Sequence, residues 1–310
     1  MILVRRALSA VALVGAALAL AAVLALAVAS SPAAALSDGA ARVSAGDARV
    51  IGTFAMVATV TTAVRVNGEH TGQTRRRTWT IRPSACEASL CRGLTLWRER
   101  SSDIVELVGL HRTGPGRYAG SGIFDVSLSC LGRTYRLGSR VPFRITLTVT
   151  AAVRVQAIQF ARRIKATYVN PARSDDTPCP LGPSHDAARY TGTLSSPVPS
   201  PPMASFGTQV DATDETVDFT DTSQPGAGGA AIPIHKWQFD DPASGASDSS
   251  TQADPVHRFS APGSYMVNLT VTDNNELSST STQTVTVPPA GAAAGATAAA
   301  TTIRRRALGS

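Results

Sequence analysis

Apolar and polar residues alternate along three long segments in the first half of the chain. In the clearest segment, Val141 to Val155, the odd-numbered positions are all apolar, and the even-numbered positions are mainly arginine and threonine. Two more alternating segments run from Phe54 to Val66 and from Ile158 to Tyr168. Because side chains of a strand point alternately to its two faces, this period of two predicts three long, half-buried strands.

Shorter β-like runs surround these segments, and glycine-rich sequences typical of hairpin turns punctuate them. The runs are 78–82, 93–98, 104–110 and 118–128, and the turn sequences are Asn67-Gly68, Gly114-Pro115-Gly116 and Gly120-Ser121-Gly122. About eight strands in sequence with short connections favour antiparallel pairing. We therefore predict an all-β first domain, an antiparallel meander that closes into a barrel or folds over as a sandwich. Of the two, we favour the barrel.

A proline-rich stretch divides the chain into two regions of opposite charge. Residues 45–195 hold 21 Lys and Arg against 10 Asp and Glu, whereas residues 199–288 hold 2 against 11. The stretch between them, Ser-Ser-Pro-Val-Pro-Ser-Pro-Pro at 195–202, is typical of a stiff polar linker. We predict domains at 45–194 and 203–288, the linker at 195–202 and a disordered Ala/Gly-rich tail at 289–310.

The first 35 residues have the features of an export signal. Arg5 and Arg6 precede an apolar run from Ala7 to Ala29, and small residues that suit a cleavage site follow. Since this run is also long enough to span a bilayer, a retained signal anchor is the alternative to a cleaved signal peptide at 1–35. The sequence predicts a secreted or cell-surface protein, and the preference for arginine over lysine indicates a GC-rich bacterial genome.

Four cysteines in an exported chain predict two disulfides. All four, Cys86, Cys91, Cys130 and Cys179, lie in the first domain. Of three formal pairings we favour Cys86–Cys91 with Cys130–Cys179, because the first clips a hairpin and the second then closes a long loop. The alternative to two disulfides is a metal site formed by Cys86, Cys91, Cys179 and His185, but the cysteines lack the Cys-x-x-Cys spacing of a zinc knuckle.

The second domain carries a set of motifs in register. They are Val217-Asp218-Phe219-Thr220-Asp221, then Lys236-Trp237-Gln238-Phe239-Asp240-Asp241, then the long segment from Asp254 to Asn274 that contains Pro255-Val256-His257-Arg258-Phe259-Ser260 and Gly263-Ser264-Tyr265-Met266-Val267-Asn268-Leu269-Thr270-Val271-Thr272-Asp273. This pattern resembles the PKD domain family. The resemblance implies an immunoglobulin-like β-sandwich, used outside cells as a spacer or as a module that binds proteins or glycans.

The motif residues are expected to form the core of that sandwich. They are Phe219, Trp237, Phe239, Pro255, His257, Phe259, Gly263, Tyr265, Val267, Leu269, Val271 and Asp273. Where the family has a tight Gly-Asp-Gly turn, this chain has Asp240-Asp241-Pro242 and then a Ser/Ala-rich stretch. Asp240, Asp241 and Asp273 are a candidate calcium site. The competing interpretation is that these loop aspartates cap turns.

Candidate chemistry in the first domain is limited. No nucleophile elbow, zinc-protease helix or phosphate-binding glycine loop is present, so we assign no catalytic residue and no cofactor. Arg75, Arg76 and Arg77 are a candidate anion site, and alternation places Arg75 and Arg77 on the side of Trp79; the competing interpretation is a solvated hairpin tip. His185-Asp186 is interpreted as a loop contact that seats the last strand.

Three classes of function stay open. The leading hypothesis is an exported, non-catalytic binding or adhesion protein, whose partner is an extracellular protein or glycan, with weak polyanion binding by the basic domain. The alternatives are a lipocalin-like small-molecule carrier and an accessory domain of an unrecognised secreted hydrolase. A carrier requires a connected apolar cavity of some ~300 Å³ or more. The sequence predicts no specific nucleic-acid binding, and membrane contact only through a signal anchor.

Overall fold

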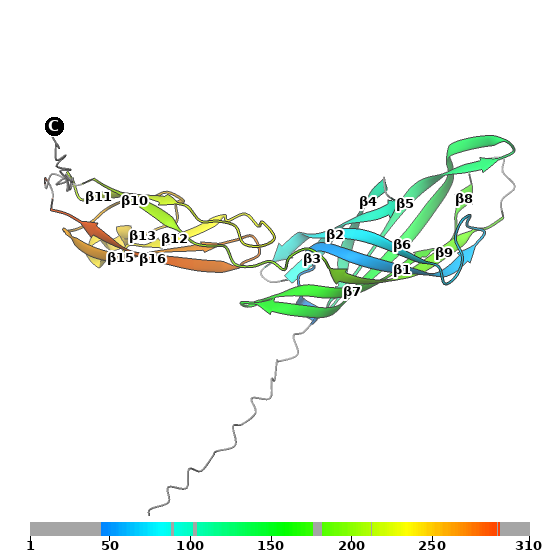
Figure 1. The fold of residues 1–310 in the computed structure, drawn as a ribbon, viewed down its shortest axis with the longest axis horizontal. Coiled ribbons are helices and arrows are strands. Elements are labelled where there is room, and N and C mark those ends of the chain that lie inside the picture. The colour runs from blue at the N-terminus through cyan, green and yellow to red at the C-terminus, as the bar shows by residue number, and fades with distance from the viewer. Residues whose placement is uncertain are drawn as a thin grey trace, which may run out of the picture. The chain divides into compact units, whose positions relative to one another are not determined.

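The computed structural model describes residues 45–87, 90–101, 104–175, 182–211, 213–289 and 291 (Figure 1). Within these ranges the chain is almost entirely β-structure, as predicted. The export signal at 1–35, Cys179 and nearly all of the tail lie outside the described residues. In the part that the structure describes, no helix has the length and apolar character needed to cross a membrane.

The first domain is a closed antiparallel barrel of eight strands, which settles the choice between barrel and sandwich. The order around the barrel follows the chain, with the last strand back beside the first, so the predicted meander is confirmed. A two-residue strand, β8 (Ser174–Asp175), adds to the edge of β6. The barrel strands are β1 (Gly52–Val64), β2 (Thr74–Glu87), β3 (Leu90–Ser101), β4 (Ile104–Gly114), β5 (Arg117–Cys130), β6 (Arg133–Val155), β7 (Ile158–Asn170) and β9 (His185–Leu194).

Alternating side chains fill one half of the barrel. In β6, for example, Val141, Phe143, Ile145, Leu147 and Val149 are all buried. The short helix η1 (Ala45–Asp47) and the residues after it close the end of this half. The carbonyl of Gly46, in η1, accepts a hydrogen bond from the Gly116 amide at the β4–β5 turn. The opposite half, where β1 and β7 end and β9 begins, is left for the pocket described below.

One turn prediction is wrong. Gly120-Ser121-Gly122 lies inside β5 and forms no turn. A side chain at Gly120 would place its Cβ 2.1 Å from the carbonyl oxygen of Gly109, and one at Gly122 would meet the ring of Phe143. These glycines permit close packing inside the wall of the barrel. The real β5–β6 turn uses Leu131 and Gly132, both at positive φ, as a two-residue antiparallel hairpin requires.

The second domain is a sandwich of two antiparallel sheets. One sheet holds β10 (Phe206–Asp211), β11 (Thr216–Asp221) and β14 (Val256–Arg258). The other holds β13 (Ser249–Ser250), β12 (Ile234–Gln238), β15 (Gly263–Thr272) and β16 (Ser278–Val287) in that order. Trp237 is fully buried between the sheets and packs against Phe206 and Phe219, with ring centroids 5.1 Å and 5.3 Å away.

The predicted core of the second domain matches the structure closely. Phe219, Trp237, Phe239, Pro255, His257, Phe259, Val267, Leu269, Val271 and Asp273 are buried, and Tyr265 is half-buried. Gly263 is exposed and begins β15. The Ser/Ala-rich stretch after Asp241 forms a short 3₁₀ segment, η2 (Pro242–Asp248). Asp248 ends this segment and accepts hydrogen bonds from the Asp241 amide and the Gln238 side chain, both at 2.6 Å, so the unusual turn is well anchored.

Candidate functional site

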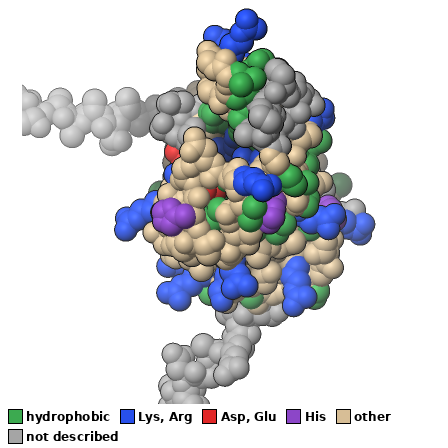
Figure 2. Space-filling view, turned by 90° about the vertical axis from the view of Figure 1, so that its right-hand side faces the viewer, with side chains coloured by type: hydrophobic (Ala, Val, Ile, Leu, Met, Phe, Trp, Pro, Cys, Tyr) green, Lys and Arg blue, Asp and Glu red, His purple; other side chains and the backbone are tan. Residues whose placement is uncertain are grey.

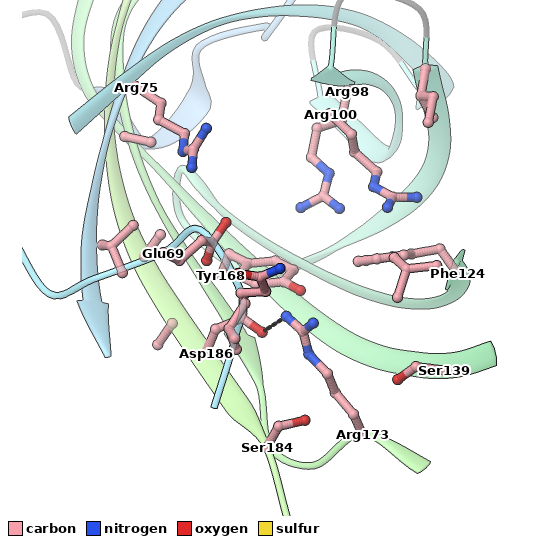
Figure 3. A pocket seen from close by; sticks show the side chains of 18 of the residues that line it. Glu69, Arg75, Arg98, Arg100, Phe124, Ser139, Tyr168, Arg173, Ser184 and Asp186 are labelled. Atoms are coloured by element: carbon pink, nitrogen blue, oxygen red, sulfur yellow. Dashed lines mark hydrogen bonds and ion pairs between the residues drawn. The ribbon is translucent and has the colours of Figure 1, made fainter. Parts of the chain in front are cut away.

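A pocket of about 700 Å³ occupies the unfilled half of the barrel. Residues from all eight barrel strands line it, together with the loop after β1 and the segment between β7 and β9 (Figure 3). Its volume falls in the range of small-molecule sites in proteins. Viewed toward this side of the molecule, Lys and Arg side chains are spread over the surface, and Asp and Glu show only in small areas (Figure 2).

Arginine is the dominant polar residue of the pocket. Six arginines line it against three carboxylates, a formal excess of three positive charges. Arg75 and Arg77 come from β2, and Arg98 and Arg100 come from β3. Each pair continues an inward-facing series, Trp79 and Ile81 on β2 and Leu94 and Leu96 on β3, all four buried. The same alternation therefore places apolar side chains in the filled half of the barrel and guanidinium groups in the half that holds the pocket.

Arg98 is a structural member of this group. It is buried, its Nε and Nη2 atoms donate to Glu106 at 3.1 and 2.5 Å, and its guanidinium lies 4.7 Å from the ring centroid of Phe143 and 4.9 Å from that of Tyr168. A buried guanidinium needs such a carboxylate partner to offset the loss of hydration. Arg98 therefore holds the wall of the pocket in place.

Arg100 and Arg75 face each other across the pocket (Figure 3). The guanidinium carbon of Arg100 stacks 3.3 Å from the ring centroid of Phe124, and burial lowers the pKa of Arg100 from its usual value. Arg75 donates to the carbonyl of Gly68 at 3.0 Å and to Gln73 at 3.3 Å, but its Nε has no acceptor in the described structure. Arg77 donates to the carbonyl of Arg76 at 2.9 Å.

Two of the three carboxylates in the pocket already have partners. Asp186 pairs with Arg173 at 2.6 Å, and Glu99 accepts the Thr78 amide at 2.9 Å. Glu69 lies on the loop after β1. These contacts leave the pocket with many more donors than acceptors.

The hydroxyl groups of two tyrosines that line the pocket add to the donors. Burial raises the pKa of both Tyr168 and Tyr190, so both phenols are protonated at neutral pH and can donate. Tyr190 packs on Trp79 with ring centroids 4.8 Å apart, and the buried Trp79 Nε1 has no acceptor in the described structure. Unpaired buried donors of this kind are costly unless a ligand or water supplies an acceptor.

Of the three consecutive arginines at 75–77, only one is solvated as expected for a hairpin tip. Arg75 and Arg77 point into the pocket as alternation predicted, whereas Arg76 is exposed on the outer face. The sequence analysis missed Arg98, Arg100 and the two tyrosines. The signal that would have found the arginines is the continuation of the Leu94, Leu96 alternation past the last apolar residue of β3.

Other predicted residues fall elsewhere. Cys86 and Cys91 form the expected disulfide. Cys130 is also disulfide-bonded, and its predicted partner Cys179 lies outside the described residues. His185 opposes Val64 at the start of β9, and Asp186, also in β9, binds Arg173, so both residues belong to the last strand and not to a loop.

The calcium hypothesis finds no support. Asp241 is buried against His257 and Ser260, Asp240 accepts the Met266 amide, and Asp273 caps the amides of Asn275 and Leu277. In the ranges that the structure describes, no three His, Cys, Asp or Glu residues are grouped as metal ligands. The aspartates serve as separate turn acceptors.

Comparison with known proteins identifies the second domain. The family model described as PKD domain matches residues 199–287, so the match begins inside the stretch predicted as linker. The chain is 24% identical to the PKD1 domain of Vibrio anguillarum Epp, over 30% of this chain and 99% of that one, with a TM-score of 0.26. It is 32% identical to the PKD1 domain of the Vibrio cholerae metalloprotease PrtV, over 28% of this chain and 98% of that one, with a TM-score of 0.24. No curated protein matches the chain.

Proposed function

Since residues 199–287 place this chain among the proteins that contain a PKD domain, we propose that it is an exported binding protein whose barrel holds an anionic ligand. PKD domains occur in extracellular or secreted proteins, which agrees with the export signal predicted at 1–35. In this proposal the barrel carries the binding site, and the PKD domain is a spacer or a second contact surface.

The observation that carries the proposal is the imbalance of donors and acceptors in the pocket. Of the six arginines, Arg98 and Arg173 are paired with Glu106 and Asp186. Four arginines therefore face the two remaining carboxylates, and one of these, Glu99, already accepts the Thr78 amide. Carboxylate, phosphate and sulfate groups offer the acceptors that guanidinium groups bind best. A ligand with one or more such groups would satisfy the Arg75 Nε and contact Arg100 across the pocket.

The same geometry disfavours the two alternatives. A carrier of apolar molecules requires an apolar cavity, and this cavity is large enough but lined by arginines. A hydrolase that uses two carboxylates as acid and base would need two of the three in the pocket, Glu69, Glu99 and Asp186. Asp186 is engaged by Arg173 and Glu99 by the Thr78 amide, which leaves only Glu69. We therefore propose binding without catalysis.

Calorimetric titration of the purified chain with inorganic phosphate and with sulfate tests the proposal. The double variant Arg75→Gln with Arg100→Gln should weaken binding at least tenfold, because a hydrogen bond to a charged group contributes about 1.5–3 kcal/mol. The matched control is Arg144→Gln with Arg163→Gln, which removes the same charge from exposed positions on β6 and β7. Equal losses in both variants would show that net charge, and not the pocket, accounts for the affinity.

A further inference from the structure

The wall of the barrel is incompletely paired between β4 and β5. These strands share only three residue pairs, His111–Ala119, Arg112–Tyr118 and Gly114–Arg117, all beside their connecting turn. Beyond that short ladder β4 pairs with β3 over its whole length, and β5 pairs with β6. Two strand edges, Ile104–Leu110 and Gly120–Ser129, therefore have no ladder between them in the described structure. We call this gap the β4–β5 seam.

Local sequence explains why the ladder stops. The backbones are in close contact where Gly120 meets the carbonyl of Gly109. A Cβ on Gly120 would not fit there, whereas one on Gly109 would meet nothing within 4 Å. Past this point Phe124 of β5 lies under the guanidinium of Arg100, which comes from β3 on the far side of β4. This stack lines the inner side of the seam, next to the pocket.

Unpaired strand edges are templates for an added strand. Their free amide and carbonyl groups can hydrogen-bond to an extended chain, as in the peptide-binding mode called β-strand addition. Soluble proteins normally protect such edges with charges, bulges or proline. The edge of β4 from Ile104 to Leu110 has the sequence Ile-Val-Glu-Leu-Val-Gly-Leu, which carries no proline and a single charge.

The outer side of the seam is apolar along β4 and at Ile123 of β5, which lies between the exposed Ser121 and Asp125. Leu107 and Val105 of β4 are 63% and 62% exposed, and Ile123 of β5 is 53% exposed. Large apolar side chains at this exposure on both borders of one gap favour contact with a partner. Outward side chains of an added strand would lie against them.

The inner side of the seam is basic and opens into the pocket. Ile104 from one border and Phe124, Val126 and Leu128 from the other line that pocket together with Arg98 and Arg100. A strand placed in the seam would therefore direct every second side chain toward guanidinium groups. The two faces of the seam therefore favour binding of a strand that is acidic on one side and apolar on the other.

We propose that the β4–β5 seam binds an extended peptide segment with alternating acidic and apolar residues, which adds as a strand to the free edge of β4. This proposal rests on the anion-binding function proposed above and assigns its ligand to a protein partner. The acidic side chains enter the pocket toward Arg100 and Arg75, and the apolar side chains cover Val105, Leu107 and Ile123.

The test uses a fluorescent heptapeptide of alternating glutamate and valine, which matches the seven residues from Ile104 to Leu110. Two comparison peptides have the same residue composition: one has its glutamates and valines in blocks, and the other is N-methylated at every amide, so that neither of its edges can pair as a strand. Anisotropy titrations with the full chain should show at least tenfold tighter binding of the alternating peptide than of either comparison peptide. Amide hydrogen exchange should show slower exchange in 104–114 when that peptide is bound.

Two results would overturn the strand-addition proposal while leaving anion binding intact. One is equal affinity for all three peptides, which would indicate attraction by charge alone. The other is phosphate binding in the pocket without any peptide binding. Failure of both phosphate and peptide to bind would reject the proposed function together with this inference. Arg100→Gln should weaken binding of the alternating peptide at least fivefold, and Arg163→Gln should leave the affinity for that peptide unchanged.

Discussion

Replacement of Asp241 tests how the PKD domain is stabilised in the absence of the usual tight turn. The side chain is 1% exposed and accepts three hydrogen bonds: from the Ser260 amide at 2.9 Å, from the Ser260 hydroxyl, and from His257 Nε2 at 3.2 Å. His257 is itself buried and stacks on Phe239 with ring centroids 4.2 Å apart. Asp241 therefore joins the η2 turn to the strand that carries His257.

The magnitude follows from what each substitution leaves unpaired. Asp241→Ala leaves the buried His257 Nε2 and two part-buried donors of Ser260 without their acceptor, and an unsatisfied buried donor costs about 1–3 kcal/mol. Asp241→Asn keeps the shape, because its oxygen can accept from His257 and the Ser260 amide while its NH₂ donates to the Ser260 hydroxyl. Only the charge is lost, which costs about 1 kcal/mol.

The pH dependence has a definite sign. Burial alone would raise the pKa of Asp241, but the hydrogen bonds from Ser260 and His257 outweigh it and hold the pKa below 3.8; burial lowers the pKa of His257 below 6.5. A group with a lowered pKa stabilises the fold above its unfolded pKa, and this contribution is lost as the pH falls through the folded value. The domain should therefore lose stability below pH 6.5 as His257 becomes charged, and lose more below pH 3.8.

Hydrogen exchange during urea unfolding of the full chain measures these effects separately for each domain. Fragments within 256–272 report on the PKD domain, and fragments within 141–155 report on the barrel as an internal control. The control variant Asp240→Asn changes an exposed acceptor of the Met266 amide, so its effect should stay below about 0.5 kcal/mol. If Asp241→Ala cost no more than Asp241→Asn, the hydrogen-bond reasoning would be refuted.

Two further predictions concern the barrel. Arg98→Met should destabilise it by about 3–5 kcal/mol in the same exchange measurement, because Glu106 is left without its cation, and adding Glu106→Leu should recover most of the loss; a double variant as unstable as the single one would contradict this. Replacing Cys86 and Cys91 by serine should lower barrel stability by about 2 kcal/mol for so short a loop and leave the cysteine-free PKD domain unchanged, so an effect on fragments from 256–272 would count against independent domains.

Local patterns predicted most of the strands because strand period and hydrophobic period coincide. Val141 to Val149 alternate in burial as their sequence indicates, and the motif residues around Trp237 form the core that the PKD resemblance implies. The glycines at 120 and 122 were misassigned, since a glycine needed for close packing looks the same in sequence as one needed for a turn.

The candidate site shows the same division. Alternation placed Arg75 and Arg77 on the inward side, because the direction of a side chain in a strand is a local property. Whether that inward side meets packed side chains or an open pocket depends on how many strands close the barrel and how its two ends are filled. Sequence alone determined the β class of this chain, its two oppositely charged regions and the inward face of β2. Tertiary structure decided three features: the placement of Arg75 across the pocket from Arg100, the stack of Arg100 on Phe124, and the seam between β4 and β5. Each involves residues from different strands, whose relative positions are fixed only when the barrel closes.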